Sequence, residues 1–114
     1  MAGVTDTAFR QMICKYGRQH AVFTEFMPCD SLYSPDRNLL LVDLKYHASG
    51  RPVVAQVFRR RPKTVFKTAE LVRELGFDGI DINTRRPDRN VVTQGAGAGL
   101  IRNPTLMTEI IKVC

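Results

Sequence analysis

The 114-residue sequence has few of the residues and patterns that mark several common classes of protein. It contains only three cysteines, Cys14, Cys29 and Cys114, and their odd number and wide spacing fit neither a disulfide framework nor a zinc site. The two histidines, His20 and His47, also lack metal-ligand spacing, so we expect no bound metal. Unpaired cysteines are typical of a reducing compartment, and we therefore expect a cytoplasmic protein.

Long apolar runs are absent as well. No stretch of the sequence approaches the roughly 20 apolar residues that a membrane-spanning helix needs. The N-terminus lacks the charged start and apolar run of a signal peptide. The sequence also has no internal repeat, and its only low-complexity segment is a short run of glycines. We expect one small domain that does not associate with a membrane.

Acidic residues are outnumbered by basic ones. The 17 lysines and arginines against 11 aspartates and glutamates give a net charge of +6. The composition, 44% apolar and 25% charged, is that of a globular chain rather than a disordered one. The excess of positive charge favours an anionic partner, with nucleic acid the first candidate. The alternative is a basic, solvated surface without a specific partner.

The spacing of apolar and turn residues predicts strands that alternate with helices. Strands are expected at residues 21–25, 52–58 and 79–83, and helices from the cap Thr5 to Gly17, at residues 36–41, from Pro62 to Gly76, and at residues 104–113. Val65, Ala69, Val72 and Leu75 form the predicted buried stripe of the third helix. Such alternation indicates a parallel sheet with right-handed crossovers. Three parallel strands would leave long unpaired edges, which indicates part of a larger α/β fold.

Polar side chains lie near the ends of two predicted strands. Gln56 lies in the apolar second strand, and Asp81 and Asn83 share one side of the third. The carboxyl ends of parallel strands lie on the same side of a sheet, where amides can bond a planar heterocycle. The alternative is that Gln56 satisfies nearby backbone and Asn83 caps a turn.

Glycine and basic residues follow these strands. The run Gly95–Gly99 matches neither the dinucleotide nor the Walker A pattern, and predicts either a phosphate loop or a tight turn with close backbone packing. The basic residues form two clusters, which either meet a phosphate backbone or are simply solvated. They are Arg59, Arg60, Arg61, Lys63 and Lys67 after the second strand, and Arg85, Arg86 and Arg89 after the third.

Several segments, taken in order, resemble the tRNA-dihydrouridine synthase family, which are flavin enzymes built on a TIM barrel. They are residues 1–6 (MAGVTD), Phe9-Arg10, Thr24-Glu25, 52–58 (PVVAQVF), 76–83 (GFDGIDIN) and 95–100 (GAGAGL). The resemblance implies FMN-dependent reduction of uridine to 5,6-dihydrouridine in tRNA, with NADPH or NADH as the reductant. It also implies that residues 1–114 are an N-terminal fragment of a TIM-barrel flavin-binding domain, a partial (β/α)8 barrel with about three parallel strands.

The same resemblance implies a role for particular residues. Met1, Ala2 and Gly3 would lie along the flavin, and Gln56 would hydrogen-bond the edge of its isoalloxazine ring. Asn83 would contact the target uracil, which has to leave its stack to be modified.

The resemblance also shows a departure at the catalytic position. The family's general acid is the cysteine of the pattern Asn-x-Gly-Cys-Pro, which donates a proton to the uracil ring. This chain reads Asn83-Thr84-Arg85-Arg86-Pro87, so that Arg86 stands at the position of the cysteine. Arginine is effectively always protonated and is a poor proton donor. We therefore expect the chain to be inactive. A TIM barrel needs about 250 residues, so we also expect that the chain is truncated and that it binds FMN weakly or not at all.

Two other interpretations stay open. The chain could be a non-catalytic remnant that binds tRNA or another RNA through its basic loops, in which case binding would depend on salt and persist without flavin. It could instead be another FMN-dependent TIM-barrel oxidoreductase, which would reduce a small molecule.

Overall fold

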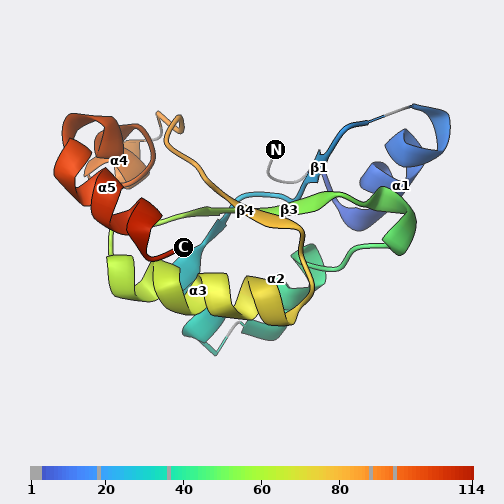
Figure 1. The fold of residues 1–114 in the computed structure, drawn as a ribbon, viewed down its shortest axis with the longest axis horizontal. Helices are drawn as coiled ribbons and strands as arrows, with labels where there is room; N and C mark the ends of the chain where they lie inside the picture. Colours follow the sequence, from blue (N-terminus) through green and yellow to red (C-terminus); the bar gives the residue numbers. More distant parts are fainter. Residues whose placement is uncertain (1–3, 18, 36, 88, 94) are drawn as a thin grey trace.

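The computed structural model describes residues 4–17, 19–35, 37–87, 89–93 and 95–114. A parallel sheet crosses the middle of the molecule, with α2 and α3 against one face and α1 and α5 at opposite ends (Figure 1). The elements are α1 (Thr7–Tyr16), β1 (Val22–Phe23), β2 (Met27–Pro28), α2 (Arg37–Asp43), β3 (Val53–Phe58), α3 (Pro62–Glu74), β4 (Gly79–Ile82), α4 (Arg89–Thr93) and α5 (Pro104–Lys112). Short 3-10 helices cover Cys29–Tyr33, Ala48–Gly50 and Gly97–Arg102. The predicted fold class, parallel strands alternating with helices as in part of a TIM barrel, is confirmed.

The first strand of the sheet is broken by a bulge. β1 and β2 both pair with β3, at Val22↔Val53 and Met27↔Val57, while β4 also pairs with β3. Val22 and Met27 are five residues apart but their partners are four apart, so one extra residue is accommodated between them. The hydroxyl oxygen of Thr24 accepts from the backbone N–H of Gln56 at 3.0 Å within this gap. The predicted strand at residues 21–25 is thus too long, and the predicted loop from Met27 begins instead as β2.

The two faces of β3 have different surroundings. Val53, Ala55 and Val57 are buried, while the residues between them are half-buried. Ala55 and Val57 belong to the apolar core, which includes Val65 and Val72 of α3. The core therefore lies between the sheet and its covering helices, and Gln56 faces the opposite side.

The buried stripe of α3 differs from the predicted one. Val65 and Val72 are buried as expected, but Leu75 is 38% exposed, because the helix ends at Glu74 and Leu75 is its C-cap. Thr68 is buried in the stripe, where its hydroxyl donates to the carbonyl of Thr64 at 2.9 Å. That bond satisfies the hydroxyl within the helix, which makes a threonine acceptable at a buried position.

α1 is capped one residue later than predicted. Asp6, not Thr5, is the N-cap, and its carboxylate accepts from the backbone N–H of Phe9 at 2.7 Å. A carboxylate at this position also interacts favourably with the positive end of the helix dipole. Gly17 ends the helix as predicted. The α4 helix was not predicted, because its five residues are too few to show helical periodicity.

Cys29 is a buried core residue rather than a reactive thiol. Burial raises its pKa from an ordinary value of 9.0 to about 11. At pH 8 the thiolate fraction is therefore lowered roughly a hundredfold, in addition to the steric protection of the core. We expect iodoacetamide at pH 8 to modify the exposed Cys114 and to leave Cys29 unmodified in the folded protein, as read by peptide mass spectrometry.

The raised pKa of Cys29 also makes the free energy of unfolding depend on pH. Cys29 loses its proton near pH 9 when unfolded but near pH 11 when folded, so the stability that it contributes falls as the pH rises from 9 to 11. In the iodoacetamide experiment, adding denaturant should make Cys29 as reactive as Cys114. If iodoacetamide modifies both thiols at the same rate without denaturant, Cys29 is not buried as described.

Candidate functional site

Three polar side chains meet at the carboxyl ends of β3 and β4. The register of the two strands places Asp81 beside Gln56, on the face of the sheet away from α3. The side-chain nitrogen Nε2 of Gln56 donates to Oδ2 of Asp81 at 2.6 Å. Nδ2 of Asn83 donates to Oε1 of Gln56 at 3.3 Å. These two hydrogen bonds hold the three side chains together. All three residues are half-buried, so the cluster still borders solvent.

Asn83 also shapes the loop that follows β4. Its Oδ1 accepts from the backbone N–H groups of Arg85 and Arg86, at 3.1 and 3.0 Å. This is the turn in which an asparagine side chain replaces a backbone acceptor. The prediction that Asn83 caps a turn is therefore confirmed. The alternative prediction for Gln56, that its amide satisfies nearby backbone, is wrong, since the amide bonds Asp81 and Asn83.

The Arg86 side chain stacks on an aromatic ring at the same edge of the sheet. The guanidinium carbon Cζ is 4.1 Å from the ring centroid of Phe26, a cation–π contact. Phe26 lies in the bulge between β1 and β2 and packs edge-on against Phe58, at 5.9 Å between ring centroids. Arg86 is therefore held between the turn that follows β4 and the segment that joins β1 to β2, whereas Arg85 is exposed.

The glycine run packs closely against the loop that carries Arg86. Gly97 has a φ of +54°, and a Cβ there would come within 2.8 Å of the carbonyl oxygen of Arg86. A Cβ on Gly99 would come within 2.9 Å of the carbonyl oxygen of Val92. The backbone N–H of Ala98 donates to the Arg86 carbonyl at 3.1 Å. The run is therefore a tight turn with close backbone packing, one of the two predicted possibilities.

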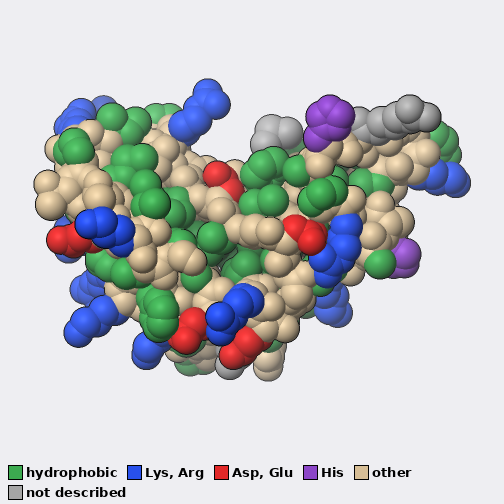
Figure 2. All heavy atoms as spheres, in the orientation of Figure 1, with side chains coloured by type: hydrophobic (Ala, Val, Ile, Leu, Met, Phe, Trp, Pro, Cys, Tyr) green, Lys and Arg blue, Asp and Glu red, His purple; other side chains and the backbone are tan. Residues whose placement is uncertain are grey.

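The basic residues after β3 differ in their contacts. Arg59 forms an ion pair with Asp30 and is mostly buried, and the Lys67 ammonium lies 6.0 Å from the ring centroid of Tyr33. Arg60, Arg61 and Lys63 instead line a surface hollow together with Leu106 of α5. On the face drawn in Figure 2, Lys and Arg side chains lie mostly near the rim, and the area between them holds hydrophobic and uncharged atoms together with some Asp and Glu side chains. Arg59 thus has a structural role, whereas Arg60, Arg61 and Lys63 are exposed.

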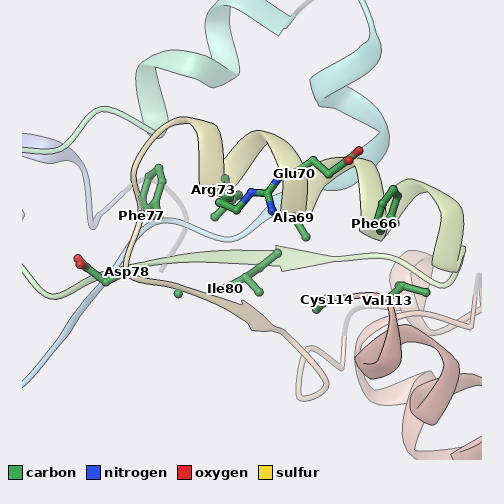
Figure 3. A pocket seen from close by; sticks show the side chains of 11 residues that line it. Phe66, Ala69, Glu70, Arg73, Phe77, Asp78, Ile80, Val113 and Cys114 are labelled. Atoms are coloured by element: carbon green, nitrogen blue, oxygen red, sulfur yellow. The ribbon is translucent and has the colours of Figure 1, made fainter.

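A second hollow lies away from the polar cluster. It has a volume of about 280 Å³ and lies between α3, β4 and the end of α5 (Figure 3). Its apolar lining includes Phe66, Phe77, Ile80 and Val113. Ile80 is on the core side of β4, and neither Gln56 nor Asn83 lines this hollow. It is therefore separate from the site at the strand ends.

Sequence reasoning found part of this site. Gln56, Asn83 and Arg86 were predicted and lie together, whereas Met1, Ala2 and Gly3 lie outside the described residues. Asp81, Phe26 and Phe58 were not predicted as site residues. Asp81 was recognised as sharing a side of the strand with Asn83, and that pattern could have identified it.

Within the described ranges, no helix has both the length and the apolar character needed to cross a membrane. Over the same residues, no group of three or more metal-ligating side chains comes together.

Comparisons with known proteins agree with one another. The model of the dihydrouridine synthase family matches residues 1–114. A probable tRNA-dihydrouridine synthase 2 of Bacillus subtilis (strain 168) is 35% identical over 113 residues, which are 98% of this chain and 35% of that protein. Probable tRNA-dihydrouridine synthases of Staphylococcus aureus (strain COL) and Staphylococcus epidermidis (strain ATCC 35984) are 33% and 32% identical, each over 98% of this chain and 34% and 35% of their own lengths. The chain therefore spans about a third of the length of these curated relatives.

Proposed function

The chain belongs to the dihydrouridine synthase family, and on this premise we propose that residues 1–114 form the N-terminal part of a TIM-barrel flavin-binding domain whose proton donor is replaced. The reaction of that domain is the FMN-dependent reduction of uridine to 5,6-dihydrouridine in tRNA, with NADPH or NADH as reductant. Gln56 holds the edge of the isoalloxazine ring, Asn83 contacts the uracil, and Arg86 stands where the acid is needed. This chain by itself does not reduce tRNA.

The hydrogen-bonded pair of Gln56 and Asn83 carries the proposal. Their side chains are 3.3 Å apart at the carboxyl edge of the sheet, so the groups for the flavin and for the uracil are immediate neighbours. The amide of Gln56 still has one N–H and one lone pair beyond its bonds to Asp81 and Asn83. That donor and acceptor suit the N–H and C=O groups of the pyrimidine part of a flavin. FMN, when bound, supplies the hydride.

Arg86 explains the expected lack of activity. A guanidinium stays protonated throughout the physiological range, so it cannot deliver a proton to carbon as a thiol can. The side chain is also held against Phe26 by the cation–π contact and by the turn that Asn83 caps. The proposed site thus keeps its binding groups and lacks its acid.

An assay on unmodified tRNA tests this function. We expect the chain, supplied with FMN and NADPH, to form no dihydrouridine, while the Bacillus subtilis relative forms it under the same conditions. A titration that follows flavin fluorescence measures FMN binding, and the weak binding expected from the sequence stays a prediction until then. Gln56→Leu should weaken any FMN binding about tenfold, because it removes the bonds to the ring edge. Turnover by the chain would overturn the proposal.

The exposed basic residues favour a second function, the binding of tRNA without chemistry. Arg60, Arg61 and Lys63 line one hollow, and Arg85 is exposed beyond β4. If these side chains contact phosphates, tRNA affinity should fall steeply as salt rises and should not require flavin.

The three free thiols support a cytoplasmic location for either function. Reduction of a small molecule instead of tRNA would identify another kind of FMN-dependent oxidoreductase.

A further inference from the structure

The polar cluster forms a hydrogen-bond chain whose direction is set at both ends. At one end, the carboxylate of Asp81 can only accept when it is ionised. At the other end, the backbone N–H groups of Arg85 and Arg86 can only donate, and both point to Oδ1 of Asn83. Between these ends lie two amides, each of which could be turned either way in the absence of such partners.

The partners at the two ends of this hydrogen-bond chain determine the orientation of both amides. The side-chain oxygen of Asn83 accepts from the backbone N–H groups, so its nitrogen faces Gln56. The side-chain oxygen of Gln56 then accepts from Asn83 at 3.3 Å, and its nitrogen donates to Asp81 at 2.6 Å. Reversing either amide would place two oxygens or two N–H groups against each other, which costs the bonds on both sides.

The orientation matters because Gln56 has bonding capacity left. Its nitrogen carries a second hydrogen and its oxygen a second lone pair, so it presents one donor and one acceptor of defined identity. An amide free to rotate would present them in either order. An oriented amide discriminates among ligand edges, since a mismatched edge leaves polar groups unpaired.

We infer that Asp81 is a positioning residue that holds the Gln56 amide in one orientation, together with Asn83, whose own amide is fixed by the backbone N–H groups that follow it. The oriented amides then select a planar ring whose edge carries a carbonyl next to an N–H, the pattern shared by the pyrimidine ring of a flavin and by uracil. The identity of these rings rests on the proposed function, whereas the orientation of the amides rests on the hydrogen bonds themselves.

Nuclear magnetic resonance of the side-chain amides tests the orientation without any ligand. In Asp81→Ala we expect the NH2 resonances of Gln56 to shift, whereas those of Asn83 should change little, because two backbone N–H groups still fix its amide. The Gln56 hydrogens should exchange with water about tenfold faster once their acceptor is gone. Asp81→Asn should restore the original resonances, because its oxygen can still accept. Glu109→Gln, on the exposed face of α5, is the control for loss of one carboxylate.

Two outcomes of this measurement would overturn the inference. One is a folded Asp81→Ala protein whose Gln56 resonances are unchanged. The other is an Asp81→Ala protein that does not fold, because Asp81 would then support the fold rather than orient the Gln56 side chain.

A titration with FMN separates this inference from the proposed function. Asp81→Ala and Gln56→Leu should each weaken FMN binding about tenfold, and the double variant should be no weaker than Gln56→Leu alone, because Asp81 acts through Gln56. Equal affinity of Asp81→Ala and the unchanged protein would overturn the positioning role. Turnover of tRNA by the unchanged protein would overturn the proposed function and not this inference, and if the unchanged protein binds no measurable FMN, the resonance measurement still decides whether Asp81 orients Gln56.

Discussion

A hybrid enzyme that carries residues 1–114 of this chain in place of the matching third of the Bacillus subtilis relative is expected to be inactive on tRNA. Introducing Arg85→Gly and Arg86→Cys together should raise its rate of dihydrouridine formation at least about 100-fold, since a positioned general acid contributes about 100- to 10,000-fold. The hybrid supplies the rest of a full-length relative, so the assay isolates the loop after β4. Dihydrouridine in tRNA, measured by mass spectrometry of nucleosides, gives the rate.

The single substitutions show which residue matters. Arg86→Cys restores the thiol but leaves a bulky arginine beside it, and Arg85→Gly restores only the shape of the loop. We expect Arg85→Gly alone to remain at the starting rate, because no proton donor has been added. FMN content, measured for every hybrid, shows whether the barrel has formed. An active starting hybrid, or a double variant that contains FMN and stays inactive, would mean that Arg86 is not what prevents the reaction.

Arg10→Met is expected to lower the free energy of unfolding by about 3 kcal/mol, the largest stability effect that we predict for one side chain. Arg10 is 5% exposed, and burial lowers the pKa of its guanidinium. The guanidinium donates to the carbonyl of Thr5 at 2.5 Å, to the carbonyl of Lys45 at 2.6 Å and to the hydroxyl of Thr7 at 3.1 Å. It thereby joins the start of α1 to the segment after α2, and methionine would remove these three hydrogen bonds.

Urea denaturation followed by circular dichroism measures this loss. Lys15→Met, an exposed position on the same helix, removes the same charge and should change the free energy of unfolding by less than about 0.5 kcal/mol. Arg10→Lys should fall between the two, because an ammonium cannot span all of these acceptors. A loss below about 1 kcal/mol for Arg10→Met would show that the buried guanidinium contributes little net stability.

The sequence by itself determined the order of the main elements and the edge of the sheet at which the candidate site lies. Apolar runs of strand length, helix caps and glycine stops are local features, so they identify β3, α3 and β4 without knowledge of the rest of the chain. Because parallel strands end on one side of a sheet, the placement of Gln56 and Asn83 at a common edge followed from their positions in two successive strands.

The tertiary structure decided how these residues bond and what surrounds them. The contact of Gln56 with Asp81 depends on the register between β3 and β4, and the position of Phe26 depends on a bulge in the first strand. Registers and bulges are set by pairing between distant segments, which local patterns do not encode. The stacking of Arg86 on Phe26 joins residues from opposite sides of β3 and could not be predicted from either segment alone.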